Sequence, residues 1–287
     1  MKKFAIAALV LSVLLAGIGY AVIKSKVTLD SANQKYAKGD YAAAYRDYTV
    51  LATQNSPAAI HNLGLMYHTG KYVEEDHDRA FQCFLQAAQK GHPEAQYNTA
   101  ICYMTGDGVK QSQEQSLVWT TRAAENKLPI AVTNLACAYL NAEGVPQDIP
   151  KGFAMLKQSA DDGENNAQFK IGQMYLEGTF SAPQDSCKAV YYLTMAGQNG
   201  NSEAKAMLGI LFFAGNRVPQ DIELAKKILW DAYIDDQEPL AMAFWLVYAD
   251  RRGKKEIAQK LLSELTDKKI DWKVKVGEVK YYLGERE

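Results

Sequence analysis

The chain's histidines are the side chains most suited to metal or acid–base chemistry, and all four lie in one segment: His61, His68, His77 and His92. His61 and His68 are seven residues apart, which places them on one face of a helix, and Asp76 and Asp78 follow closely. Imidazole and carboxylate groups bind metals, but no compact ligand motif links these residues. We therefore expect no metal or cofactor, and interpret the histidines as surface or groove-lining side chains.

The cysteines follow no regular spacing: Cys83, Cys102, Cys137 and Cys187. A disulfide between Cys102 and Cys137 would need their Cα atoms within about 7 Å, and the alternative is small buried thiols. The cysteines therefore do not indicate a redox compartment.

The sequence contains no motif typical of an enzyme. A glycine-rich phosphate loop, a Gly-x-Ser-x-Gly elbow and a His-Glu-x-x-His pair are all missing. The charge is balanced, with 32 basic and 33 acidic residues, which argues against nucleic acid as a partner. We expect a non-catalytic protein.

The first residues form a separate apolar segment. The run Phe4–Ile23 is flanked by lysines on both sides and would span about 30 Å as a helix, which is the thickness of the hydrocarbon core of a bilayer. We interpret residues 1–26 as a membrane anchor, with a cleaved signal peptide as the alternative. Ile18 follows Leu15-Ala16-Gly17 where a lipoprotein would have cysteine, so lipid attachment is not expected there.

The rest of the chain repeats with a period of 36 or 37 residues, which predicts stacked helical hairpins. The clearest column is alanine: Ala59, Ala95, Ala131, Ala167, Ala204 and Ala241. In the first five of these repeats a small residue follows five positions after this alanine, an aromatic residue three positions after that, and a glycine three positions further on. Ala142 stands in place of one of these glycines. Small residues let neighbouring helices approach closely, and the glycine suits a left-handed helix end. At Ala142 we expect Asn141 or Gly144 to make the turn.

A second set of columns predicts where the second helix of each hairpin begins. The expected N-cap residues are Asp76, Ser112, Asp148, Asp185 and Asp221. One hairpin cannot bury its own apolar face, so neighbouring hairpins must supply the core.

These columns resemble the Sel-one-like repeat, a relative of the tetratricopeptide repeat. The resemblance implies an all-α, right-handed α-solenoid of stacked helix-turn-helix repeats over residues 57–252, in addition to the N-terminal transmembrane or signal helix. We expect residues 27–56 to form a tetratricopeptide-like cap hairpin and residues 253–287 to form capping helices. Within the C-terminal segment, the apolar pattern predicts one helix over Lys254–Leu265 and a final amphipathic helix from Trp272.

By the same resemblance, the first helices of the repeats line a concave groove. We expect this groove to bind a protein partner through one set of residues: His61, Asn62, Tyr97, Asn98, Asn134, Phe169 and Lys170. Asparagine can donate and accept hydrogen bonds, so a row of such side chains can hold an extended peptide. The alternative is that these asparagines brace the neighbouring helix.

The resemblance implies a protein-binding scaffold or adaptor of unknown partner, and we place it at the bacterial inner membrane with the repeat domain in the periplasm. A soluble periplasmic protein is the alternative location. Two other functions remain open: an immunity protein that neutralises a secreted lipase-type toxin, and an accessory to polysaccharide export or cell-wall enzymes.

Overall fold

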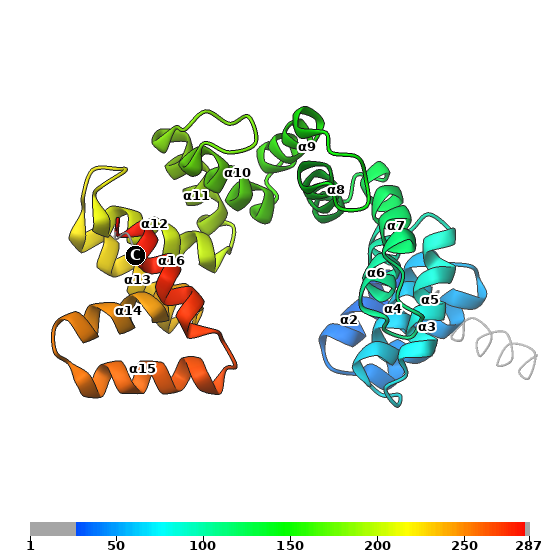
Figure 1. Ribbon diagram of the computed structural model, residues 1–287. Coiled ribbons are helices and arrows are strands. Elements are labelled where there is room, and N and C mark those ends of the chain that lie inside the picture. Colours follow the sequence, from blue (N-terminus) through cyan, green and yellow to red (C-terminus); the bar gives the residue numbers. More distant parts are fainter. Residues whose placement is uncertain (1–26, 285–287) are drawn as a thin grey trace, which may run out of the picture. The chain divides into compact units, whose positions relative to one another are not determined.

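The computed structural model describes residues 27–284, and this part of the chain contains fifteen helices and no strand (Figure 1). The apolar run Phe4–Ile23 and its expected helix lie outside the described residues. Within residues 27–284, no helix has the length and hydropathy needed to cross a membrane. The predicted all-helical repeat architecture is confirmed for the described residues.

The chain divides after Leu128 into two compact units. The described part of unit 1 holds six helices: α2 (Leu29–Ala37), α3 (Tyr41–Thr53), α4 (Pro57–Thr69), α5 (His77–Gln89), α6 (Pro93–Thr105) and α7 (Gln113–Glu125). The described part of unit 2 begins at Pro129 and holds nine: α8 (Pro129–Asn141), α9 (Ile149–Asp161), α10 (Asn165–Glu177), α11 (Ser186–Gln198), α12 (Ser202–Ala214), α13 (Ile222–Ile234), α14 (Pro239–Arg251), α15 (Lys255–Asp267) and α16 (Trp272–Tyr282).

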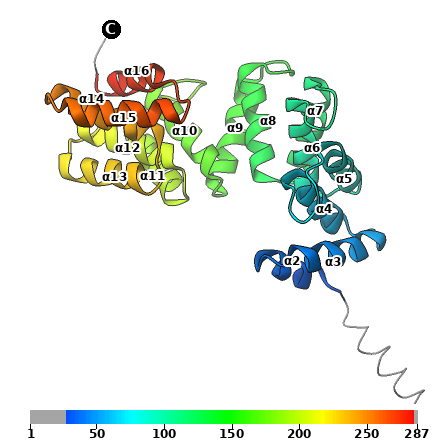
Figure 2. The ribbon, with the colours of Figure 1, turned by 90° about the horizontal axis from the view of Figure 1, so that it is seen from below.

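Within each unit, consecutive helices pack as hairpins and each hairpin packs on the next one. Both views show this arrangement, with α15 lying beside α14 near the C-terminal end (Figures 1 and 2). The expected helix over Lys254–Leu265 is observed as α15. The expected final helix is α16, which packs against α12 and α14 and buries Val279 and Tyr282.

Helix starts follow the predicted caps. In each case the capping side chain accepts a hydrogen bond from the backbone N–H three residues later, and these residues are Asp76, Ser112, Asp148, Asp185 and Asp221. The carboxylate or hydroxyl satisfies an amide that the helix itself leaves unpaired. The caps therefore fix where each second helix begins.

Helix ends follow the predicted glycines, with one correction. The first helix of four hairpins ends on a left-handed glycine: Gly70, Gly106, Gly178 and Gly215. The expectation that Asn141 or Gly144 replaces this glycine in the α8 hairpin is wrong, because Ala142 itself adopts the left-handed conformation, with φ of 59°. The turn therefore forms with a residue that has a Cβ atom, for which the left-handed conformation is strained.

The column of small residues allows the helices of a hairpin to approach closely. A Cβ atom built on Gly64 would lie 2.7 Å from the Phe84 ring, and one on Gly209 would lie 2.7 Å from Leu229. The space that glycine leaves is filled by the apolar side chain of the second helix. This packing continues through the core of unit 2, where Leu156, Leu193 and Leu229 are fully buried.

Candidate functional site

The predicted groove residues of unit 1 are engaged with neighbouring repeats. The Asn62 side chain donates a hydrogen bond to Oδ1 of Asn33 (3.0 Å), and the Asn98 amide lies 2.9 Å from Nε2 of His61. His61 is only 8% exposed, and its burial, with His92 beside it, lowers its pKa to about 4. Tyr97 is half-buried. These contacts tie each first helix to the preceding hairpin.

In unit 2 the predicted groove residues differ in accessibility. Phe169 is buried in the core cluster, whereas Asn134 is exposed. Lys170 is half-buried and lines a hollow of about 170 Å³ together with Cys137 and Gln173. The structure therefore places Asn134 and Lys170 at the surface of unit 2 and removes Phe169 from it. Recognition through this groove remains a prediction.

The histidines separate into two pairs, and neither contains the predicted combination of His61 and His68. His61 stacks on His92, with ring centres 4.9 Å apart, and His68 meets His77 edge to face at 5.3 Å. Asp76, the acidic residue proposed near them, caps α5 and pairs with Arg79. The two pairs thus belong to different environments of unit 1.

All four cysteines, which lie in the described part of the chain, are free thiols. Burial raises the pKa of Cys83 and Cys137, and it raises the pKa of Cys102 to about 11. A thiol with a raised pKa is a poor nucleophile because little thiolate is present at neutral pH. Cys83, Cys102 and Cys137 therefore act as small packing residues, whereas Cys187 is exposed.

A largely apolar hollow lies at the C-terminal end of unit 2, and we call it the aromatic pocket. It has a volume of about 480 Å³, and helices α13, α14 and α15 with the turn between the last two supply its lining: Trp230, Tyr233, Trp245, Tyr248, Ala249, Arg252, Lys254, Ile257, Lys260 and Leu261. Its size is sufficient for one or two large side chains of a partner.

Contacts among its aromatic side chains hold the wall of the aromatic pocket in place. The Trp245 indole N–H donates a hydrogen bond to the carbonyl oxygen of Leu229 (3.3 Å). Its ring meets Trp230 and Tyr248 edge to face, with centres 5.8 and 5.5 Å apart. Edge-to-face packing of this kind favours one ring geometry. Tyr233 completes the wall by donating a hydrogen bond to Glu264.

The mouth of the aromatic pocket combines exposed apolar surface with positive charge. Trp230 and Ile257 are 52% and 54% exposed, and both line the same pocket, so they form an apolar patch and not single exposed side chains. Three basic residues border them, and the Arg252 guanidinium lies 4.7 Å from the centre of the Tyr248 ring. Tryptophan, tyrosine and arginine are the residues most enriched at binding hot spots. This surface suits a protein segment with a large apolar side chain next to acidic residues.

The sequence carries a signal for the aromatic pocket in two columns of the repeat. Trp245 and Tyr248 occupy columns that hold aliphatic or small residues in the earlier repeats, such as Leu208 and Leu211 in the preceding one. Large aromatic residues at positions that otherwise take aliphatic ones indicate a surface that the next repeat does not cover.

Comparisons with known proteins agree with this architecture. A family model described as "Sel1 repeat" matches five consecutive segments: residues 57–92, 93–128, 129–164, 165–201 and 202–229. No curated protein gives a significant match.

Solved structures give further similarities. A Sel1 repeat protein from Oxalobacter formigenes is 27% identical, with a TM-score of 0.75, over 84% of this chain and 99% of that one. An immunity protein from Pseudomonas aeruginosa is 19% identical, with a TM-score of 0.52, over 72% and 80% of the two chains. At that identity the likeness concerns the fold alone.

Proposed function

Because the chain belongs to the Sel1 repeat family, whose members act as protein-interaction scaffolds, we propose that it is a non-catalytic scaffold that binds a protein partner through the aromatic pocket of unit 2. The observation that carries this proposal is the half-exposed Trp230 beside a basic rim. The occupant that fits is a peptide segment with an aromatic or aliphatic anchor flanked by aspartate or glutamate.

The site of action that we propose is the bacterial cell envelope. The apolar run Phe4–Ile23 supports it, since its length matches a membrane span and lysines flank it. In this arrangement the repeats work in the periplasm, attached to the inner membrane or released after cleavage. Within unit 2, the groove residues Asn134 and Lys170 then offer a second, more polar contact surface.

The test is site-specific crosslinking in intact cells with the full chain. A photoreactive residue replaces Ile257 at the mouth of the aromatic pocket, and the matched control carries it at Tyr191, which is 58% exposed on α11 and does not line the pocket. We expect a discrete adduct from position 257 that disappears in the Trp230→Ala background. Equal adducts from both positions, or an adduct unaffected by Trp230→Ala, would contradict the proposal.

A second candidate function is immunity against a secreted toxin. The observation that favours it is the shared fold with the Pseudomonas aeruginosa protein that is described as an immunity protein. If this chain has that role, then the crosslinked partner is a toxin encoded next to it, and deletion of this gene is lethal only when the toxin gene is present. A deletion strain that grows normally beside an active neighbouring toxin would exclude this function.

A further inference from the structure

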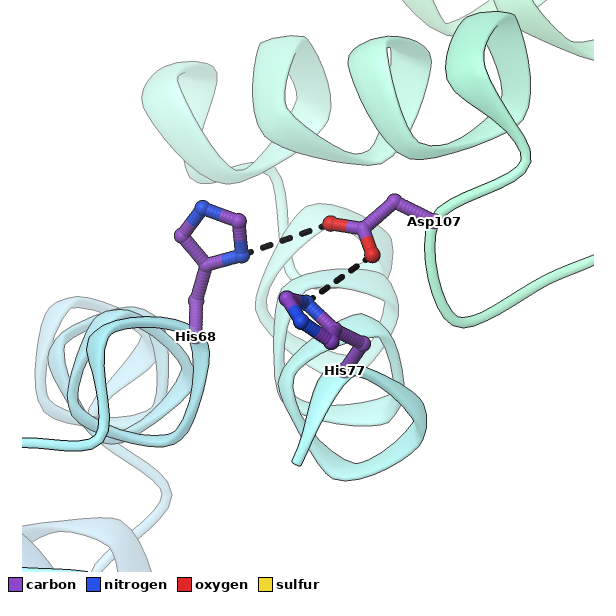
Figure 3. Close-up of side chains that lie close together, drawn as sticks. All are labelled: His68, His77 and Asp107. Carbon is purple, nitrogen blue, oxygen red and sulfur yellow. Dashed lines mark ion pairs between the residues drawn. The ribbon is translucent and has the colours of Figure 1, made fainter. Parts of the chain in front are cut away.

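Three side chains from separate elements of unit 1 converge on one point (Figure 3). His68 lies in the last turn of α4, His77 is the first residue of α5, and Asp107 follows the glycine that ends α6. The Asp107 carboxylate lies between the two rings, with Oδ2 at 3.3 Å from Nδ1 of His68 and Oδ1 at 2.9 Å from Nδ1 of His77. One ligand atom from each residue falls within 4.8 Å of the other two.

The two nitrogens of the His77 ring have different surroundings. Nε2 lies 2.7 Å from Oε1 of Glu75, a distance at which its N–H donates to the carboxylate. Nδ1 is buried and makes no hydrogen bond with any described residue, although the Asp107 oxygen is close. In a neutral imidazole whose Nε2 carries the proton, Nδ1 presents a lone pair. A lone pair and a carboxylate oxygen at this distance repel each other unless a cation, either a proton or a metal ion, lies between them.

This arrangement is the one that metal-binding histidines adopt. Such a histidine almost always donates its second ring N–H to a carboxylate, a backbone carbonyl or water, which fixes the tautomer and raises the basicity of the ligating nitrogen. Glu75 occupies that position for His77. In a tetrahedral zinc site with bonds of about 2.0–2.1 Å, neighbouring ligand atoms are about 3.4 Å apart. The separation of 3.3 Å between His68 and Asp107 agrees with that spacing.

The backbone holds Asp107 in place. Gly108 has φ of +65°, and a Cβ atom built on it would lie 2.0 Å from the carbonyl oxygen of His77. The loop after α6 is thus pressed directly against the start of α5. On the other side of Asp107, Gly106 ends α6 in the left-handed conformation. The loop can follow this path only with glycine at position 108, and the path sets the carboxylate beside His77.

The fold does not require ligand-type side chains at these positions. Two repeat periods further along the chain, in unit 2, the corresponding residues are Leu140, Ile149 and Thr179. Two aliphatic side chains and a threonine therefore serve in a hairpin of the same architecture. The combination of two histidines and an aspartate is specific to the contact between the first and second Sel1 repeats.

We propose that His68, His77 and Asp107 bind one divalent transition-metal ion, with zinc as the best-suited ion, and that Glu75 orients His77. Two imidazole nitrogens and one carboxylate oxygen are ligands that zinc accepts, and water completes the fourth position. The ion joins the end of α4, the start of α5 and the loop after α6. It thereby clips the first repeat to the second within unit 1.

The sequence did not reveal this site because its ligands come from three elements and two repeats. The spacing along the chain groups His68 with His61, whose ring instead contacts Asn98 and His92. The proposed metal site departs from the expectation of no metal, and it can be tested directly.

The test uses the full chain, purified without a histidine tag, stripped with a chelator and dialysed. Zinc is titrated into it by calorimetry, and cobalt(II) is added separately so that visible absorption reports the coordination geometry. We expect one zinc ion per chain, tetrahedral cobalt bands and a zinc-dependent rise in the unfolding temperature. His68→Gln, His77→Gln and Asp107→Asn should abolish these signals, and Glu75→Ala should weaken zinc binding by roughly 10–100-fold.

His92→Ser is the matched control. It removes a histidine from the same unit, and serine keeps the N-cap that His92 provides to α6. This variant should bind zinc as the wild type does. Circular dichroism of the apo proteins checks that each variant folds, and His68 is exposed enough for His68→Gln to keep the fold. Failure of the wild type to bind zinc, binding that survives the three ligand substitutions, or loss of binding in His92→Ser would each overturn the proposal.

Discussion

The side-chain amide of Asn98 lies 2.9 Å from Nε2 of His61, and this contact joins the first helices of two consecutive repeats. The Asn98 amide nitrogen can only donate, so in this contact Nε2 of the neutral ring accepts. Both residues were expected to face a partner. The structure shows them bonded to each other, in the same way that Asn62 bonds to Asn33 one hairpin earlier, and their contact with a partner remains a prediction. At these two positions the asparagine braces the preceding helix.

The buried His61 ring should make unit 1 sensitive to mild acid. Its pKa is lowered to about 4 because burial disfavours the charged form and His92 lies against it, while Glu94 partly offsets this. The unfolded chain binds the proton near pH 6.5, so the stability is fully present above that pH and is lost as the pH falls toward 4. We expect a loss of about 2 kcal/mol at pH 5.

His61→Gln tests this directly, because glutamine can still accept a hydrogen bond from Asn98 but does not titrate. Urea unfolding of wild type and variant is compared from pH 7.5 down to pH 4.5. The variant should lose less free energy of unfolding over this range than the wild type. Parallel pH profiles for the two proteins would show that His61 is not the group responsible.

The helix boundaries could be predicted because they depend on local chemistry. A residue such as Asp148 caps a helix through an amide three residues away, so its role is readable from the sequence alone. Whether a helix face is buried or exposed depends instead on which neighbouring helix covers it. His61 and Phe169 share one column of the period, and both are buried. The period identifies residues that share a face, but it does not say whether the next repeat covers that face.

The aromatic pocket and the cluster of His68, His77 and Asp107 could not be predicted from the repeat columns, for the same reason. The aromatic pocket exists because α15 lies along α14 and leaves Trp230 half exposed, and the packing angle of a final hairpin is not encoded in the repeat columns. The cluster of His68, His77 and Asp107 depends on the path of one glycine loop. Both result from tertiary contacts, which the spacing of residues in a single sequence does not determine.

Replacing Ala142 by glycine should stabilise unit 2. Ala142 ends α8 with φ of 59°, a conformation that costs a residue with a Cβ atom about 1 kcal/mol relative to glycine. Ala142→Gly should therefore raise the free energy of unfolding by about 1 kcal/mol, measured by urea denaturation. The reciprocal control is Gly178→Ala, at the equivalent turn with φ of 71°, which should lower it. Changes of the same sign in both variants would rule out this explanation.

Gly152 should tolerate alanine poorly although it lies inside a helix, where alanine is normally favoured. A Cβ atom there would lie 2.8 Å from the backbone oxygen of Ala136 and 2.8 Å from Cγ of Leu140. Because a backbone oxygen cannot move aside as a side chain can, we expect Gly152→Ala to destabilise the protein by about 1–3 kcal/mol.

Gly277 in α16 provides the control for that substitution. No atom lies within 4 Å of a Cβ built on it, so Gly277→Ala should add the ordinary helix preference of alanine, about 0.5–1 kcal/mol. Thermal unfolding of the two variants should therefore shift in opposite directions. Equal shifts would mean that the close approach of α8 and α9 does not limit the residue at position 152.

Glu238 should make unit 2 less stable as the pH rises. This side chain caps α14 by accepting a hydrogen bond from the Ala241 N–H (2.9 Å), yet it is only 4% exposed. Burial raises its pKa to about 7, and Glu203 adds to the shift whereas Lys275 opposes it. The folded state therefore holds the proton that the unfolded chain releases near pH 4.5, so stability is greatest in acid and falls as the pH rises through 7.

Glu238→Gln should remove this dependence while keeping an oxygen that can cap the helix. Between pH 5 and pH 8, the wild type should lose about 2 kcal/mol more of its free energy of unfolding than the variant does. Urea denaturation at the two pH values gives this difference, and the comparison at pH 5, where the wild-type carboxyl is mostly protonated, corrects for any change in capping. If the two proteins lose equal stability between pH 5 and pH 8, the Glu238 carboxylate must contact water or a cation when it ionises. Ionisation of a buried Glu238 carboxyl would then not be what destabilises unit 2.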